Sequence, residues 1–403
     1  MNELSSLGLI LLLALLAGHL VQALRVPEVT GYLLAGIALG PSVLGWVSHE
    51  NLQALNVLSE VALGLILFSV GSVFHQVRFA RYGRRIFYLT LIESAAAALL
   101  VGVGTLVTGQ SWQVAGLLGA IAIATAPAST LMVLRECNSK GPLSDTLLGI
   151  IAVNNILCLG AYSLVAACID LGSGWGASGA LIETFYGSIY PLIWQLIGSV
   201  ALGFLVGLML AGWATKVNEQ GEMLMLLAGS VLLCVGVARI LELSALIASL
   251  MVGATMVNLS AQSRRLFHTL SRMDPPFYAI FFVIAGADLD VSLVPSMGIL
   301  GAYYVFARAA GKFWGARYAA RWLGLEDAVQ RLLGFGLMAQ AGLAVGLVLV
   351  INQRFPEHAE IVSTVVLSSV VIYEMFGPIS TRYAVTRSGE ARPDQPEPAS
   401  IID

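Results

Sequence analysis

Two adjacent asparagines, Asn154 and Asn155, lie inside an apolar stretch at 143–168. Amides are costly to bury in an apolar segment, so this pair is expected to have partners or a task. Amide oxygens can ligate Na⁺ or K⁺, but amides cannot release protons. Neighbours on a helix point about 100° apart, so both cannot face one point squarely. In the alternative interpretation, the amides only cap broken backbone or join helices by hydrogen bonds.

Two basic residues, Arg308 and Lys312, lie four positions apart on one face of the apolar run at 296–320. A cation this deep in an apolar run should face a cavity or a partner. Among acidic residues we favour Glu374, because it lies near the middle of the run at 359–385. The other candidate partners are Glu60, Glu93, Glu242, Asp288 and Asp290. A lysine that gains and loses a proton is one interpretation, and an ion pair that only fixes helix packing is the other.

One apolar run is interrupted near its middle by the segment 124–130. Pro127 removes a helix hydrogen bond there. Thr125, Ser129 and Thr130 offer hydroxyls to the freed backbone groups. The segment therefore predicts a broken helix, with a simple proline kink as the alternative.

A second interruption lies at 338–346 and contains Gln340 and Gly342. Breaks at corresponding places in two halves of a chain are the best sequence indication of a transporter site, because half-helix ends expose N–H and C=O groups to ions. Close packing through glycine is the alternative interpretation.

The composition indicates the environment in which these residues lie. The chain has 403 residues, of which 58% are hydrophobic and 11% charged, whereas a soluble domain carries about 25% charged residues. The mean hydropathy is +0.84. These values predict an all-α polytopic membrane protein. The net charge of −3 gives no indication of nucleic-acid binding.

Thirteen runs are long enough, at about 20 residues, to be transmembrane helices. They fall near 4–24, 29–47, 53–73, 86–108, 112–134, 143–168, 187–213, 222–238, 242–259, 277–295, 296–320, 328–351 and 359–385. With the N-terminus outside, the inner loops and helix ends receive 17 of the 21 basic residues. That asymmetry follows the positive-inside rule and predicts a cytoplasmic C-terminus in a multi-pass plasma (inner) membrane protein.

Residues 1–387 therefore form one transmembrane domain, and the polar, Pro-rich tail at 388–403 is predicted to be disordered. The tail is too short for a nucleotide-binding regulatory domain. The chain has no Walker loop, nucleophile elbow or zinc motif. We accordingly expect neither an enzyme, nor a cofactor, nor a transition-metal site, and membrane lipid is the expected surrounding.

Several motifs spread over the membrane part belong together. They are VPEVTGYLLAG at 26–36 running into LGP at 39–41, LILFSVG at 65–71, FFVIAGADLD at 281–290, ARAAGK at 307–312 and QAGLAVGL at 340–347. In these motifs the chain resembles the monovalent cation:proton antiporter-2 family of the cation:proton antiporter superfamily.

The resemblance implies thirteen helices in inverted repeats, with two broken helices that cross and frame an ion site. It also implies a homodimer in which a mobile core, about 86–168 and 296–385, moves against a dimer or scaffold domain formed by the remaining helices. Thr125, Ser129, Asn154 and Asn155 would line the ion site. Arg308 and Lys312 fit the basic position that the family places on a later core helix.

The sequence departs from the family at the acidic position. The family often has Asp-Asp, Asn-Asp or Gln-Asp beside the crossing, where this chain has Asn154 and Asn155. Natural divergence and an engineered Asp→Asn change at position 155 would both explain the difference.

Three hypotheses about function remain open. The first is a secondary active transporter that exchanges Na⁺ or K⁺ for protons by alternating access, with Lys312 or Glu374 as the titratable group. The second is a transporter of bicarbonate or a small carboxylate that uses Arg308 and Lys312. The third is a transport-inactive protein, either a membrane sensor that retains the fold or an engineered Asp→Asn form.

Overall fold

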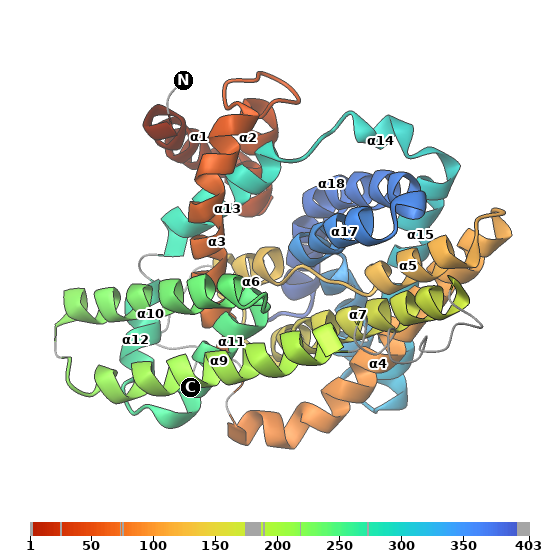
Figure 1. The fold of residues 1–403 in the computed structure, drawn as a ribbon. Coiled ribbons are helices and arrows are strands. Elements are labelled where there is room, and N and C mark those ends of the chain that lie inside the picture. Colours follow the sequence, from red (N-terminus) through yellow and green to blue (C-terminus); the bar gives the residue numbers. More distant parts are fainter. Residues whose placement is uncertain are drawn as a thin grey trace. The chain divides into compact units, whose positions relative to one another are not determined.

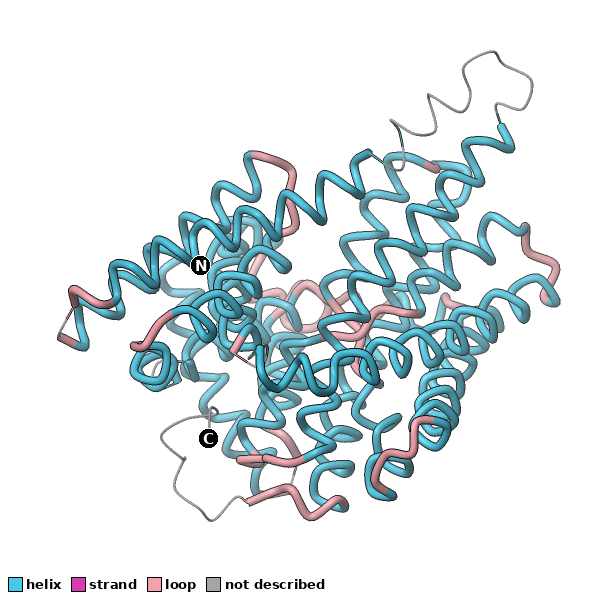
Figure 2. The backbone as a smooth tube through the Cα atoms, turned by 90° about the horizontal axis from the view of Figure 1, so that it is seen from below, coloured by secondary structure: helices cyan, strands magenta, loops and turns pink. Residues whose placement is uncertain are grey.

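Helices make up nearly all of the computed structural model, and no strand occurs in the part of the chain that it describes (Figure 2). The described residues are 3–24, 26–72, 74, 76–173, 187, 190–217, 219–271 and 274–392. The prediction of an all-α polytopic membrane protein is confirmed.

The chain divides into two units. The first unit comprises residues 1–83, 194–289 and 392–403, and the second comprises residues 84–193 and 290–391. The second unit encloses the ranges expected for the core, 86–168 and 296–385. The roles of mobile core and dimer domain stay predictions.

The first unit is built from α1 (Glu3–Ala23), α2 (Glu28–Leu39), α3 (His49–Gly71), the part of α9 (Tyr190–Ala214) from residue 194, α10 (Gln220–Ile240), α11 (Ala245–Leu259), α12 (Ser263–Ser271) and α13 (Asp274–Ala287). Helix α13 packs on α2 and α3, and α11 packs on α3 (Figure 1). A β-carbon at Gly36 would meet the carbonyl oxygen of Val283, and one at Gly253 would meet that of Phe68. Glycine at these positions therefore allows backbone-to-backbone contact at two helix crossings.

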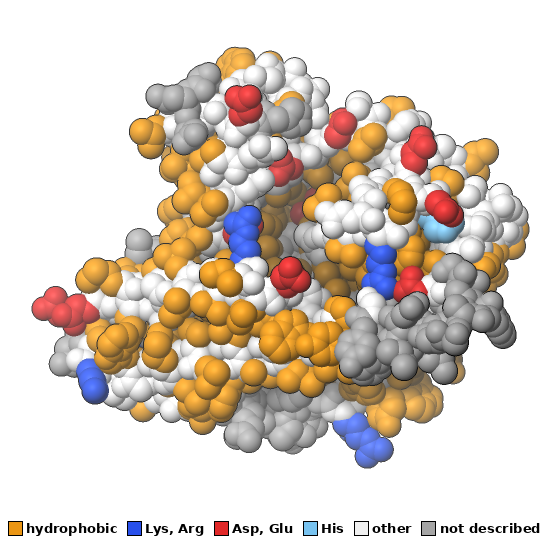
Figure 3. All heavy atoms as spheres, in the orientation of Figure 1, with side chains coloured by type: hydrophobic (Ala, Val, Ile, Leu, Met, Phe, Trp, Pro, Cys, Tyr) orange, Lys and Arg blue, Asp and Glu red, His pale blue; other side chains and the backbone are white. Residues whose placement is uncertain are grey.

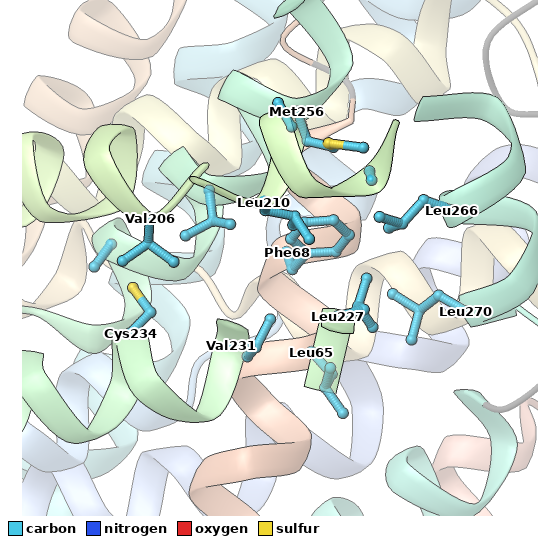
Figure 4. Packing of buried hydrophobic residues seen from close by; sticks show 14 of the residues in the cluster. Leu65, Phe68, Val206, Leu210, Leu227, Val231, Cys234, Met256, Leu266 and Leu270 are labelled. Carbon is cyan, nitrogen blue, oxygen red and sulfur yellow. The ribbon is translucent and has the colours of Figure 1, made fainter. Parts of the chain in front are cut away.

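An apolar core fills the space between α3, α9, α10, α11 and α12 (Figure 4). Phe68 of α3 stacks on Phe267 of α12 with ring centroids 4.9 Å apart. Val231 of α10 and Met256 of α11 are fully buried in the same cluster.

The second unit holds the elements that carry the predicted site residues. They are α4 (Gln76–Val107) from residue 84, α5 (Trp112–Ala122), α6 (Pro127–Glu136), α7 (Pro142–Ser173), α14 (Leu293–Ser296), α15 (Gly298–Trp322), α16 (Asp327–Leu332), the 3₁₀ helix η2 (Leu333–Leu337), α17 (Gly342–Arg354) and α18 (Pro356–Arg387).

Each of the thirteen expected runs overlaps a helix of the structure. Eight candidate spans in the described residues are long and apolar enough to cross a membrane, and a ninth is added if the pair 327–337 and 342–354, bent by 44°, is one span. The number of crossings therefore stays a prediction.

Two expected runs extended too far. Helix α2 ends at Leu39 instead of continuing to residue 47, because Pro41 lacks the N–H that helix continuation requires. Helix α13 ends at Ala287 instead of continuing to residue 295. The Asp290 carboxylate accepts a hydrogen bond from the Ser292 N–H at 3.0 Å, and this local turn competes with a helix.

Large apolar side chains are exposed along α9, which is a favourable arrangement in a membrane and an unfavourable one in water. Ile197, Leu205 and Trp213 are 65%, 63% and 55% exposed. Figure 3 shows apolar side chains over much of the visible surface, with few charged ones among them.

Residues 388–392, at the start of the predicted disordered tail, belong to the described part of the chain. Glu390 is buried and forms a cap for α7, the helix of Asn154 and Asn155. Its carboxylate accepts hydrogen bonds from the Leu143 N–H at 2.7 Å and from the Ser144 N–H at 2.9 Å. Gly141 precedes the helix without a side chain, and a β-carbon there would collide with Glu390. A carboxylate is favourable at a helix N-terminus, so this contact fixes Glu390 against α7, while residues from 393 lie outside the described part.

We expect Glu390→Ala to lower the free energy of unfolding by about 2 kcal/mol, because it leaves N–H groups of α7 without an acceptor. The melting temperature in detergent measures the effect. Glu390→Gln should lower the melting temperature less, since its amide oxygen still accepts one of these hydrogen bonds. Equal melting temperatures for wild type and Glu390→Ala would contradict the cap.

Candidate functional site

The first helix break separates α5, which ends at Ala122, from α6, which begins at Pro127. Ala126 has an extended backbone (φ −71°, ψ 119°), as expected of a residue that precedes proline. The break leaves carbonyl oxygens at the end of α5 without helical partners.

The second break separates η2, which ends at Leu337, from α17, which begins at Gly342. The two breaks are joined directly, because the Ala126 N–H donates to the Ala339 carbonyl at 3.0 Å. The Gln340 side chain adds a bond from Nε2 to the Ile121 carbonyl at 3.1 Å. The segments predicted from Pro127, Gln340 and Gly342 therefore meet in one place.

Arg308 of α15 fills the junction of the two breaks. Its guanidinium is fully buried and lies over the Tyr373 ring, 4.3 Å from the centroid. It donates to four carbonyl oxygens: Ala122 at 3.1 Å, Ala124 at 2.6 Å, Met338 at 2.8 Å and Ala339 at 3.4 Å. The planar fork of donors suits Arg308 to this task. This geometry favours a structural role over the predicted role in charge coupling.

Lys312, one turn further along α15, forms an ion pair with Glu93 of α4. Nζ lies 3.2 Å from Oε2 and donates to Oε1 at 3.3 Å, and both side chains are completely buried. Nζ also donates to the Ile123 carbonyl at 2.5 Å and to the Thr125 hydroxyl at 3.1 Å. The ammonium thus lies in a ring of four oxygen atoms at the first break.

Asn154 completes this cluster from α7. Its Nδ2 donates to Glu93 Oε1 at 2.8 Å and to Thr125 Oγ1 at 3.0 Å, and its Oδ1 accepts from Ser94 Oγ at 3.1 Å. Asn154 therefore orients the carboxylate and the hydroxyl that contact Lys312. Glu93 Oε2 accepts no hydrogen bond from the described residues, and its contact with the Lys312 ammonium is the ion pair alone.

Close helix packing brings Glu93 and Lys312 together. Gly311 and Gly315 flank Lys312 on α15, and a β-carbon at Gly311 would lie 2.5 Å from Ala97 Cα of α4. A β-carbon at Gly315 would lie 2.9 Å from Glu93 Cα. The two glycines let the backbones of α4 and α15 approach, which is the small-xxx-small arrangement of membrane helix pairs.

We expect Gly311→Val to separate α4 from α15 and to abolish transport, because the clash is with backbone that cannot turn aside. Transport by the purified, reconstituted variant and its melting temperature should both fall. Gly229→Val is the matched control, since that helical glycine has open space around it. Wild-type activity of Gly311→Val would contradict the packing argument.

The other predicted site residues lie outside the Lys312 cluster. Asn155 is half-buried, and its Oδ1 has no hydrogen-bond partner among the described residues. Ser129 and Glu374 are buried and lie beside each other, on α6 and α18. The ion pair of Lys312 is with Glu93, not with the favoured Glu374.

Glu93 was one of several candidate acids, and two features of the sequence agree with its pairing without distinguishing it from the others. It is the only acidic residue in the run at 86–108, and the paired glycines around Lys312 indicate a close helix neighbour. The sequence did not identify that neighbour as α4.

The model of a family described as sodium/hydrogen exchanger, transmembrane, matches residues 8–385. The chain belongs to the sodium/hydrogen exchanger family. The predicted resemblance to cation:proton antiporters is confirmed.

Two relatives of this exchanger are similar over most of their length. One is the ammonium/H⁺ antiporter subunit AmhT of Alkalihalophilus pseudofirmus, 22% identical over 348 residues, with 85% of each chain covered. The other is the Na⁺/H⁺-K⁺ antiporter GerN of Bacillus cereus, 25% identical over 355 residues, with 84% of this chain and 85% of GerN covered.

The exchanger also shares its fold with a solved structure, that of the sodium proton antiporter MjNhaP1 from Methanocaldococcus jannaschii. The TM-score is 0.67 at 17% identity, and the match covers 96% of this chain and 97% of MjNhaP1. The predicted antiporter fold is thereby confirmed.

Proposed function

We propose that this exchanger is a secondary active transporter that exchanges a monovalent cation, Na⁺ or K⁺, for protons by alternating access. The observation that carries the proposal is the buried ion pair between Glu93 and Lys312 at the junction of two broken helices. The relatives named as Na⁺/H⁺-K⁺ and ammonium/H⁺ antiporters support the same substrate class.

Cation and proton would compete for the oxygen ring that now holds the Lys312 ammonium. Its members are the Glu93 carboxylate, the Ile123 carbonyl and the Thr125 hydroxyl. These are the oxygen ligands that alkali cations accept, and unwound backbone carbonyls serve this purpose in transporters. Two cations cannot share the ring in a medium of low dielectric constant, because their repulsion is strong there.

Proton release therefore follows from cation entry. When Na⁺ or K⁺ binds, Lys312 gives its proton to the water on the open side and withdraws as a neutral amine. When the cation leaves, Lys312 takes up a proton and pairs with Glu93 again. The Glu93–Lys312 pair with its bound ion has the same net charge in both forms, so neither form leaves the Glu93 carboxylate without a counter-charge when it crosses between the inward and outward states.

This scheme requires no acid at position 155, because Glu93 supplies the carboxylate. Asn154 orients that carboxylate and Thr125 in both forms. The bicarbonate or carboxylate hypothesis loses its basis in this geometry. Glu93 neutralises Lys312, and the Arg308 donors are bonded to carbonyls.

Orientation and assembly complete the proposal. The distribution of basic residues supports a plasma membrane protein with its N-terminus outside and its C-terminus in the cytoplasm. Membership of the family supports a homodimer.

Proton flux in liposomes tests the proposed function. Purified protein is reconstituted with a pH-sensitive dye inside, a pH gradient is imposed, and Na⁺, K⁺ or choline is added. The proposal expects Na⁺ or K⁺ to dissipate the gradient and choline to leave it unchanged. Absence of Na⁺- and K⁺-dependent proton movement by the folded protein would refute it.

A further inference from the structure

A second acidic group, Glu374 of α18, is buried in the same unit as the Glu93–Lys312 pair but outside its oxygen ring. It is 3% exposed, and its Oε1 has no hydrogen-bond partner among the described residues. The Ser129 hydroxyl of α6 lies beside its carboxyl. Ser129 Oγ is also fully buried and without a hydrogen-bond partner in the described chain. Glu374 and Ser129 are thus polar neighbours in the interior.

The Glu374 carboxylate forms no ion pair among the described residues. Of the charged groups on the helices that pack against α18, Arg308 of α15 acts on it. The donors of Arg308 are bonded to the carbonyls of both breaks, and its face lies on Tyr373. A carboxylate in this position is costly to ionise, and the Arg308 charge offsets part of that cost when the proton leaves.

Its place in the fold connects Glu374 with the exchange site. Ser129 lies in the first turn of α6, immediately after the break that contains Thr125. On its other side, α18 contacts the second break, where a β-carbon at Gly377 would lie 2.7 Å from Ala339 Cα. Glu374 therefore lies next to both segments that must rearrange when the cation enters.

We propose that Glu374, with the Ser129 hydroxyl as its partner, carries a second proton in each exchange cycle. In the proton-loaded form Glu374 is a neutral acid and Lys312 an ammonium. When the cation enters, its charge favours the ionised carboxylate, and the Glu374 proton leaves to the open side together with the Lys312 proton. This inference rests on the proposed function and gives its stoichiometry.

The net charges of the two forms determine how many protons are exchanged for each cation, and this number can be measured. Without Glu374 the cation-loaded and proton-loaded forms carry the same charge, and exchange is one proton per cation. With Glu374 the cation-loaded form is more negative by one charge, so two protons are exchanged for one cation and the membrane potential drives the reaction.

The test measures the cation gradient at which net proton flux stops. Wild type and Glu374→Gln are reconstituted with Na⁺ or K⁺, whichever the wild type exchanges, and the membrane potential is held at zero by an ionophore for a different ion. At a pH difference of one unit, two protons per cation require about a hundredfold cation gradient to stop net proton flux, and one proton requires about a tenfold gradient. We expect the first result for wild type and the second for Glu374→Gln.

Control variants separate this role from a structural one. Glu360→Gln alters an exposed acid on the same helix and should behave as wild type. Exchange of internal for external cation, which needs no proton, should persist in Glu374→Gln. Loss of that exchange in the folded variant would overturn the inference.

Two further outcomes would also overturn it. They are a tenfold stopping gradient for the wild type, and equal stopping gradients for wild type and Glu374→Gln. Either would leave the proposed function intact, because exchange would still occur. Absence of any exchange by the wild type would instead refute the proposed function.

Discussion

Replacing Glu93 with glutamine is expected to abolish cation/proton exchange, with a loss of about a hundredfold or more. The substitution removes the carboxylate for which the cation and the Lys312 ammonium compete, and no other carboxylate lies in the oxygen ring that the structure describes. It also leaves the ammonium buried without a counter-charge, which costs several kcal/mol. Initial rates of Na⁺- or K⁺-dependent proton flux in liposomes measure the loss.

Two further variants make this prediction specific. Lys312→Arg keeps the positive charge but cannot release a proton near neutral pH, so it should fold and fail to exchange. Glu60→Gln changes an exposed acid of the first unit and should exchange like the wild type. Proton-coupled exchange by folded Lys312→Arg would show that the lysine does not carry the proton.

The second large effect is expected on folding. Arg308→Met should lower the free energy of unfolding by about 3–5 kcal/mol, because the substitution leaves buried carbonyls of both helix breaks without donors. We expect a low yield of monodisperse protein and a reduced melting temperature. Arg308→Lys should recover only part of the stability, since three donors on one nitrogen cannot bridge four carbonyls.

Arg321→Met serves as the control for Arg308, since Arg321 is an exposed residue in the last turn of the same helix. It should melt at the wild-type temperature. If Arg308→Met were as stable as the wild type but inactive, the guanidinium would have a role in transport, as the sequence suggested, and not the structural role that its contacts indicate.

The two helix breaks could be predicted from the sequence, because the residues that cause them lie at the breaks themselves. Pro127 cannot donate a backbone hydrogen bond, and the small residues around Gly342 give little support to a helix. Helix ends set by turns were harder to predict. The runs at 29–47 and 277–295 stay apolar beyond the residues at which α2 and α13 end, so hydropathy alone overestimated their length.

The partner of Lys312 could not be predicted from the sequence, because it depends on how α4 packs on α15. Glu93 and Glu374 both lie within apolar runs, and we favoured Glu374 only because it lies nearer the middle of its run. The deciding feature is the pair of glycines at 311 and 315, whose missing side chains admit the α4 backbone. Likewise, nothing in the composition of residues 388–392 indicates that Glu390 caps α7, since that contact joins positions far apart in the chain.

Proton release on cation binding tests the central claim most directly. Calorimetric titration of the detergent-solubilised protein with Na⁺ or K⁺ in two buffers of different ionisation enthalpy counts the protons released per cation bound. Competition at the Glu93–Lys312 pair predicts at least one proton per cation, an affinity that rises with pH, and no release by Lys312→Arg. Cation binding with the same heat in both buffers and the same affinity at every pH would contradict the account.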